Sequence, residues 1–388
     1  MSLIKCPECQ QNISSSAKNC PHCGYKITLH KCPECGENLK GEETNCPSCG
    51  YPLKGKTTSD IITENLDKIT GASSRSYVTF KDLFKNTFQK HTEEELDNIF
   101  ICGTKNTTPK LESINPNSAN AWVYFKILLF FLVAYIPNYI GFVYYENANF
   151  LPAMIILAAF AVPVTVLVFF FEINLFKNIP FHKVLKYFII GGGASLFVAI
   201  LYYSIPYIAK KTATLDYEGA FFVSLIEEIA KICITTYFLW KNKNCNYILN
   251  GLLVGAAVGA GFGAFETAGY ILRYFFNNGV ESMIEIIKLR GILAPGMHVA
   301  WGTIEGAALM YVKGSEKLDK KHLSDKRFLF TCFIPIVLHW IWDMPIVTPY
   351  YLLQVGLTIA AWMVIIYFIN LGLKQIDDVK AAHKKNLS

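Results

Sequence analysis

Two adjacent glutamates, Glu227 and Glu228, lie inside an apolar run long enough to cross a lipid bilayer. A carboxylate at the centre of a membrane helix costs roughly 2.5 to 3.5 kcal/mol on insertion scales, so an adjacent pair indicates a functional site. Lys231 follows about one turn later and projects between the two glutamates, where it can offset part of their repulsion. A desolvated glutamate beside a like charge can act as general base to a water molecule, which points to hydrolytic chemistry.

Further ionisable residues fall within the apolar runs that follow. These are Glu266 in the next run, His298 and Glu305 in the one after it, and His339 with Asp343 in the last of the three. Histidines can stabilise a developing oxyanion, and a carboxylate such as Asp343 or Glu266 can fix a histidine tautomer. Counting from the outer end of each run places Glu266, His298, His339, Asp343 and the glutamate pair in one layer of roughly 10 to 12 Å. We therefore expect a shared polar chamber, with Glu305 pairing inside the helix bundle.

The elements that must position these residues are membrane helices. Of the 388 residues, 52% are hydrophobic and 17% are charged, a composition too apolar for an ordinary soluble protein. The sequence predicts an all-α polytopic membrane protein with about eight transmembrane helices of roughly 20 residues. The expected spans are 122–144, 150–172, 185–207, 217–240, 248–272, 292–312, 327–346 and 349–371.

Glycines at four-residue spacing mark one face of the fifth expected span. Gly251, Gly255, Gly259 and Gly263 form a ridge that allows a neighbouring helix to approach closely. Glu266 projects into the same sector as this ridge, so it is expected to face protein and not lipid.

Loop charges predict the orientation of the chain in the membrane. With the N-terminus in the cytoplasm, the cytoplasmic connections between spans carry eleven Lys and Arg residues and the opposite connections carry five, among them Arg273, Lys288 and Arg290. This distribution follows the positive-inside bias. Both termini are then cytoplasmic, and the polar chamber lies toward the outer leaflet.

The N-terminal 56 residues predict two small zinc ribbons. They contain four Cys-x-x-Cys knuckles, with ten residues between the knuckles of each pair and a repeat of 26 residues between the pairs. Four thiolates from two knuckles can close a tetrahedral cage around a structural zinc ion, whereas disulfides are the competing interpretation. We expect two structural Zn²⁺ ions and reduced thiols, which places the N-terminus in the cytoplasm. The expected ligands are Cys6, Cys9, Cys20, Cys23, Cys32, Cys35, Cys46 and Cys49.

Four stretches of the chain together resemble the motifs of a known family. They are Glu227-Glu228-Ile-Ala-Lys231 (EExxK), Phe262-Gly-Ala-Phe-Glu266-Thr-Ala-Gly-Tyr270 (FxxxExxxY), the surroundings of His298, and His339-Trp-Ile-Trp-Asp343 (HxxxD). In this order they resemble the PrsW family of intramembrane proteases, distant relatives of the membrane CAAX prenyl endopeptidases. The resemblance covers about residues 122–371 and implies cleavage of a membrane-embedded or membrane-proximal protein, as in site-one cleavage of an anti-sigma factor. The expected catalytic residues are Glu227, Glu228, Lys231, Glu266, His298, His339 and Asp343.

Two mechanisms would use these same residues. In the favoured one, Glu227 or Glu228 activates water without a metal, and His298 and His339 stabilise the oxyanion. In the alternative, two histidines and a glutamate hold a catalytic Zn²⁺, although the sequence has no HExxH signature. A proton- or ion-coupled transporter is the alternative from another functional class, because buried carboxylates with a lysine also build relays.

The domain organisation follows from these segments. Residues 1–56 form the tandem zinc ribbon, 57–121 a cytoplasmic linker with one amphipathic helix over about 80–100, 122–371 the protease domain, and 372–388 a cytoplasmic tail. The expected partners are a membrane protein substrate, the lipid bilayer and a protein bound by the ribbons. Through Lys56 there are seven Lys and Arg against five Asp and Glu, so no nucleic-acid surface is expected.

Overall fold

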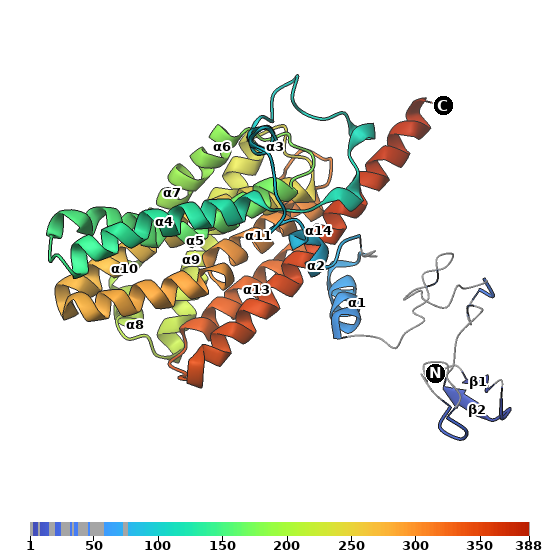
Figure 1. Ribbon diagram of the computed structural model, residues 1–388, viewed down its shortest axis with the longest axis horizontal. Coiled ribbons are helices and arrows are strands. Elements are labelled where there is room, and N and C mark those ends of the chain that lie inside the picture. The colour runs from blue at the N-terminus through green and yellow to red at the C-terminus, as the bar shows by residue number, and fades with distance from the viewer. Residues whose placement is uncertain are drawn as a thin grey trace. The chain divides into compact units, whose positions relative to one another are not determined.

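The structure is a computed structural model that describes residues 3–6, 8–14, 20–24, 32, 35–37, 46, 58–72 and 77–387 (Figure 1). The chain divides into two compact units, Met1–Asn65 and Leu66–Ser388. In the first unit, β1 (Leu3–Lys5) and β2 (Asn12–Ser14) form an antiparallel hairpin. Ile13 of β2 packs against Cys6 and Cys20, so a small apolar contact supports the first cysteine cluster.

The linker contains several short helices where the sequence predicted one amphipathic helix. They are α1 (Thr58–Thr70), α2 (Phe80–Phe84), α3 (Glu93–Phe100), η1 (Leu111–Ser113) and η2 (Pro116–Ser118). The prediction of one continuous helix over 80–100 is therefore wrong, because α2 and α3 are separate helices. The helical stretch is interrupted because Thr92 and Glu95 form a reciprocal capping pair that starts a new helix, with N–H contacts of 2.8 and 3.1 Å.

Thr70, Tyr77 and Val78 of the linker make polar contacts with the C-terminal helix α14 (Leu352–Leu387). The Thr70 hydroxyl lies 2.5 Å from the Tyr367 hydroxyl. The Asn370 side chain accepts hydrogen bonds from the backbone N–H groups of Tyr77 and Val78, at 2.7 and 3.1 Å. These bonds satisfy backbone groups that would otherwise be buried without partners.

Long apolar helices, joined by shorter helical segments, make up the rest of the second unit. They are α4 (Val123–Val143), η3 (Ala148–Phe150), α5 (Leu151–Ile173), α6 (Phe181–Lys186), the π-turn η4 (Tyr187–Gly191), α7 (Gly192–Tyr203), α8 (Pro206–Thr212), α9 (Tyr217–Lys241), α10 (Ile248–Leu293), η5 (Ala294–Gly296), α11 (His298–Lys313), α12 (Lys320–Leu323), α13 (Lys326–Asp343) and η6 (Pro349–Tyr351), followed by α14. Asp216 caps α9 and Asp325 caps α13, each by accepting backbone N–H bonds of the first turn.

Five segments among the described residues are long and apolar enough to cross a membrane. They are 116–143, 148–173, 181–203, 248–313 and 349–385. The fourth covers both α10 and α11, whereas α9 and α13 are outside the set; each carries several ionisable residues. The second unit is all-α and the chain is a polytopic membrane protein, whereas the expected number of eight spans is not confirmed.

Helix α10 reverses direction at Gly279. Gly279 has φ 84° and ψ −172°, a conformation that residues other than glycine rarely adopt, and the chain turns back here. Residues 280–293, which we call the return helix, run back beside the first part of α10. Ile271, Met283 and Ile287 accordingly share one apolar cluster with residues of α4 and α5. The fifth span therefore does not end near 272, and α11 begins only at His298, after the Ala294–Gly296 turn.

The glycine ridge brings α10 and α11 into backbone contact. A Cβ atom on Gly251, Gly255 or Gly259 would meet a backbone oxygen of α11 at 2.0 to 2.2 Å. The oxygen facing Gly259 belongs to His298. At Gly263 the neighbour is the His298 side chain, 3.4 Å from the Cβ position. The expected ridge is confirmed, and it fixes the depth and rotation of His298.

Candidate functional site

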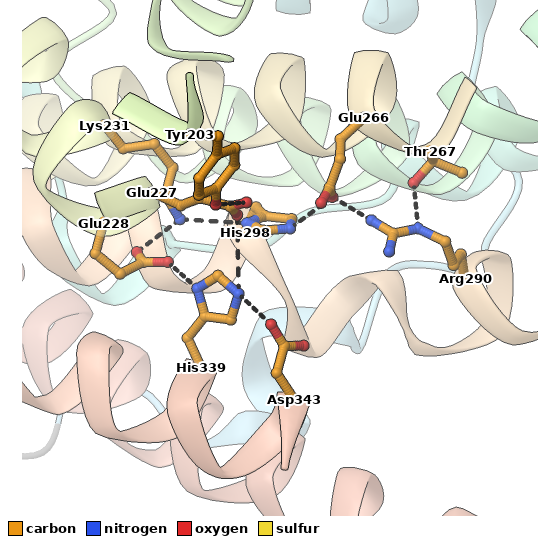
Figure 2. Close-up of polar contacts among 10 residues, drawn as sticks. All are labelled: Tyr203, Glu227, Glu228, Lys231, Glu266, Thr267, Arg290, His298, His339 and Asp343. Carbon is orange, nitrogen blue, oxygen red and sulfur yellow. Dashed lines mark hydrogen bonds and ion pairs between the residues drawn. The ribbon is translucent and has the colours of Figure 1, made fainter. Parts of the chain in front are cut away.

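Four helices bring together all seven residues expected at the site (Figure 2). Helix α9 supplies the glutamate pair and Lys231, α10 supplies Glu266, α11 supplies His298, and α13 supplies His339 and Asp343. Glu228 and Lys231 are fully buried, and His298 and His339 are each 2% exposed. Such burial of charged groups requires partners, and the contacts below provide them.

Glu228 has both carboxylate oxygens engaged. One oxygen lies 2.6 Å from the Lys231 ammonium, and the other lies 2.6 Å from Nδ1 of His339. The Lys231 ammonium also lies 3.4 Å from Nδ1 of His298. Lys231 thus lies between Glu228 and His298, and the expectation that it projects between the two glutamates is corrected. Both glutamates are neighbours of Lys231 on the helix surface, at three and four residues, and the ammonium lies on the Glu228 side, where it also contacts Nδ1 of His298.

Glu227 has one engaged oxygen and one without a hydrogen bond. Its Oε1 accepts a hydrogen bond of 2.6 Å from the Tyr203 hydroxyl of α7. Its buried Oε2 accepts no hydrogen bond from any described residue and faces Nε2 of His339 at 3.8 Å. A buried carboxylate oxygen in this state is suited to accept a hydrogen bond from a water molecule or a substrate.

His298 is held between a cation and a carboxylate. An ammonium can only donate, so Nδ1 of His298 is the acceptor toward Lys231. Nε2 then carries the hydrogen and donates to Oε2 of Glu266 at 2.9 Å. Both nitrogens of this imidazole are therefore occupied by protein groups, and the tautomer follows from the two contacts.

His339 contacts carboxylates through both ring nitrogens. Nδ1 faces Glu228, and Nε2 lies 3.2 Å from Asp343 Oδ2. A neutral imidazole has one donor nitrogen, so these two contacts need one further proton, held by the ring or by a carboxylate. The indole of Trp301 stacks on this ring with centroids 4.2 Å apart, and it fixes the plane of the imidazole.

Residues beyond the seven also belong to the site. Tyr203 contacts Glu227, and Trp301 stacks on His339. Arg290 of the return helix pairs with Glu266, although the sequence placed it in an outer connection. Glu305 is 2% exposed, but neither of its carboxylate oxygens has a hydrogen-bond partner among the described residues, so the expected pairing inside the bundle is not confirmed. For Tyr203 and Arg290 the chain offers no signal beyond a polar group at the edge of an apolar run.

Three site residues could hold a metal ion. Glu227, His298 and His339 each offer a ligand atom, and these atoms lie within 4.8 Å of one another. The unpartnered oxygen of Glu227 fits the role of a ligand. The histidines are held by Glu266 and Glu228, which is the arrangement typical of metal-binding imidazoles. The donor set is thus compatible with Zn²⁺.

The N-terminal cysteines form two separate clusters. The sulfurs of Cys6, Cys9, Cys20 and Cys23 lie within 4.8 Å of one another, and so do those of Cys32, Cys35 and Cys46. Cys49, the remaining expected ligand, lies outside the described residues. Sulfur pairs are separated by 3.5 to 3.6 Å. Four sulfurs bound tetrahedrally to zinc by bonds of about 2.3 Å lie about 3.8 Å from one another, close to the separations seen here. The S–S bond of a disulfide, about 2.0 Å, is much shorter.

The first cluster is also prepared electrostatically for a cation. Desolvation opposes ionisation of the Cys20 thiol, but hydrogen bonds from the backbone N–H groups of His22 and Cys23 outweigh it and lower the pKa of Cys20 to about 6. A thiolate at neutral pH is the form that binds zinc. The geometry and this ionisation both fit structural zinc.

Comparison with known proteins identifies the membrane domain. Residues 179–371 match the family described as PrsW family intramembrane metalloprotease. This segment is a PrsW-family domain. All seven expected site residues, together with Tyr203 and Arg290, fall within it, whereas α4 and α5 precede it. Residues 6–50 match the double zinc ribbon.

Individual relatives agree with the PrsW-family assignment. The chain is 26% identical over 187 residues to Protease PrsW of Halalkalibacterium halodurans, covering 48% of this chain and 80% of the relative. It is 26% identical over 194 residues to Protease PrsW of Bacillus subtilis, covering 49% and 81%. A stretch of 25 residues, 6% of this chain, is 60% identical to an uncharacterized protein of Haemophilus influenzae, 33% of which it covers. No solved structure matches the chain. The PrsW-family domain makes the chain a peptidase of the membrane, and the transporter alternative gains no support.

Proposed function

We propose that this chain is an intramembrane endopeptidase in which Glu227 activates the attacking water. The observation that carries this proposal is the buried Oε2 of Glu227, which accepts no hydrogen bond from the described residues and faces Nε2 of His339. A general base must offer a free lone pair within reach of the proton that it takes. Glu228 does not, because Lys231 and His339 engage both of its oxygens.

The reaction follows from the positions of these groups. Glu227 takes one proton from water while the water oxygen forms a bond to the scissile carbonyl carbon. The oxyanion so formed accepts a hydrogen bond from Nε2 of His339, the nitrogen that faces Glu227 and Asp343. The C–N bond then breaks, and the leaving amine takes the proton from Glu227. Tyr203 keeps the other oxygen of Glu227 in place throughout.

The remaining residues hold the histidines and balance charge. Glu228 orients His339 through Nδ1, and Glu266 orients His298 through Nε2. Lys231 places a cation between Glu228 and the second nitrogen of His298. The His339 imidazole and the Lys231 cation, which Nδ1 of His298 helps to hold in place, stabilise negative charge without reorganisation during the reaction.

A zinc-dependent form of the same activity is the second candidate, supported by the donor set of Glu227, His298 and His339. A bound Zn²⁺ would polarise the scissile carbonyl and lower the pKa of a bound water. Glu228 and Glu266 would then hold the ligand histidines. The position of Lys231 disfavours this form. Glu266 occupies Nε2 of His298, so Nδ1 would have to bind the metal, and the Lys231 ammonium lies only 3.4 Å from Nδ1. We therefore place the metal-free glutamate mechanism first.

The substrate is proposed to be a protein segment within or next to the bilayer, of the kind represented by an anti-sigma factor. The site is built from membrane helices, so a soluble peptide would have no direct path to it. The excess of Lys and Arg in the connections assigned to the cytoplasm supports cytoplasmic termini and a site toward the outer leaflet. The zinc ribbons, each too small to form a hydrophobic core, are proposed to bind a cytoplasmic protein.

Proteomics of membrane fragments tests the proposal. Membranes containing the wild type should release peptides that are absent with Glu227→Gln, because the amide cannot accept the proton. Glu281→Gln, an exposed glutamate of the return helix, is the matched control and should cleave like the wild type. Unchanged cleavage by Glu227→Gln would refute Glu227 as the base. Full activity of protein that contains only the ribbon zinc ions would remove the zinc-dependent form, and loss of activity on removal of a third metal would establish it.

A further inference from the structure

Arg290 is the residue of the return helix that reaches the site. Its guanidinium pairs with Oε2 of Glu266. Its Nε donates a hydrogen bond of 2.9 Å to the Thr267 hydroxyl, and the guanidinium carbon lies 4.5 Å from the centre of the Tyr270 ring. Glu266, Thr267 and Tyr270, on two consecutive turns of α10, therefore hold the Arg290 guanidinium. Figure 2 shows the contacts with Glu266 and Thr267.

The partner of Arg290 is the carboxylate that orients His298. Oε2 of Glu266 receives both the guanidinium and the Nε2 hydrogen of His298. Glu266 and Arg290 expose only 14% and 13% of their side chains. The chain of contacts Arg290–Glu266–His298 thus runs from the return helix to an imidazole of the site.

The surroundings place Arg290 on the protein side of the return helix. A narrow cavity lined by Pro163, Gly263 and Thr267 has both Arg290 and His298 in its wall. Arg273, on the other arm of the same turn, is exposed. A cation directed inward at this depth has a high desolvation cost, so its placement beside Glu266 indicates a role that a surface arginine does not have.

We propose that Arg290 is a positioning residue for the proposed proteolysis: it fixes the Glu266 carboxylate, which in turn fixes the tautomer and orientation of His298. This inference rests on the proposed function and extends the site to the return helix. Arg290 touches neither the water nor the scissile bond. Its effect belongs to the catalytic step, because a misdirected His298 leaves the entry of the substrate unaffected but weakens stabilisation of the transition state.

A purely structural role for Arg290 makes different predictions. If the guanidinium only fastens the return helix to α10, its removal should lower the yield and melting temperature of the protein, and the activity per folded molecule should stay constant. If Arg290 acts through Glu266, its removal should lower kcat in protein that remains folded. It should also have little further effect once Glu266 has been replaced.

A double-mutant cycle in the full-length protein separates these roles. Kinetics on the substrate found by fragment proteomics would compare Arg290→Gln, Arg290→Lys, Glu266→Gln and the Arg290→Gln, Glu266→Gln double variant. We expect Arg290→Gln to lower kcat roughly 10- to 100-fold, the range typical of partners that orient a functional histidine, with KM changed less than about threefold. Arg290→Lys should keep more activity than Arg290→Gln. The double variant should lie within about threefold of Glu266→Gln alone.

Two further variants complete the test. Thr267→Val removes one hydrogen bond to Arg290 and should lower kcat several-fold without loss of folded protein. Arg273→Gln is the matched control and should be unchanged. Losses that multiply in the double variant, or an Arg290→Gln protein with wild-type kcat, would overturn the inference. Absence of cleavage by the wild type would instead overturn the proposed function, and the inference with it.

Discussion

Replacing Gly259 by alanine should inactivate the enzyme without unfolding it. A Cβ on Gly259 would lie 2.1 Å from the His298 carbonyl oxygen, whereas ordinary contact begins at 3.4 Å. Helix α11 must therefore retreat by roughly 1.3 Å, the difference between these distances, and it would carry His298 with it. A misplacement of about 1 Å can cost about 100-fold in rate, so we expect kcat to fall by about two orders of magnitude.

The cost in stability should be smaller than the cost in activity. Overpacking of this kind typically lowers the free energy of unfolding by about 1 to 3 kcal/mol, whereas alanine in place of glycine within a helix raises it by about 1 kcal/mol. The Gly259→Ala protein should thus be recovered folded, with a melting temperature close to that of the wild type. This separation of stability from activity is the distinctive feature of the prediction.

The assay compares cleavage per folded molecule for Gly259→Ala and Gly269→Ala. Gly269 lies on the same helix, and a Cβ there would meet nothing within 4 Å, so its replacement should leave activity within about twofold. Wild-type activity of Gly259→Ala would show that the α10–α11 spacing does not position His298. Equal losses in both variants would show that the effect belongs to α10 in general.

Three further predictions follow from single contacts. Tyr203→Phe removes the 2.6 Å hydrogen bond to Glu227 and should lower kcat several-fold. Tyr207→Phe, at an exposed tyrosine of α8 outside the site, is the control, and an equal loss in both variants would contradict a role of Tyr203 in holding Glu227. Cys46→Ser should reduce bound zinc from two ions to one per chain by metal analysis. Cys102→Ser, which replaces a cysteine outside the expected ligand set, should keep two. The Glu172 carboxylate accepts hydrogen bonds of 2.8 to 2.9 Å from the backbone N–H groups of Trp122, Val123 and Tyr124 at the start of α4. Glu172→Ala removes this acceptor and should lower the melting temperature by several degrees, whereas an unchanged melting temperature would refute the capping role.

The convergence of the motifs was predictable because ionisable residues are rare and costly in apolar helices. Glu266, His298 and His339 each interrupt such a run, and helical spacing assigns each one to a face. The glycine ridge was predictable for a similar reason, since small residues at four-residue spacing have few other uses. These features depend on one helix at a time, which is what a periodic pattern can reveal.

The path of the chain between helices was not predictable in the same way. Residues 273–291 contain charged and polar groups and read as an outer connection, so Arg290 was counted with the loop cations. Its true position depends on the reversal at Gly279 and on packing of the return helix against α4 and α5. The expected number of eight spans is not confirmed: five described segments are long and apolar enough to cross a membrane, one of them covers both α10 and α11, and α9 and α13, which the sequence predicts as spans, lie outside this set.

The choice of Glu227 as base over Glu228 also depends on tertiary structure. The two residues are adjacent and identical, and a helix rotates them by only about 100°. That rotation directs Glu228 toward Lys231 and His339, which engage both of its oxygens, and directs Glu227 toward Tyr203, which engages one. The oxygen that remains available on Glu227 is thus defined by a tyrosine at the end of α7, a helix without any motif residue. The sequence locates the carboxylate pair, and the neighbouring helices determine which oxygens of the pair have contacts, on which the proposal of Glu227 as the base depends.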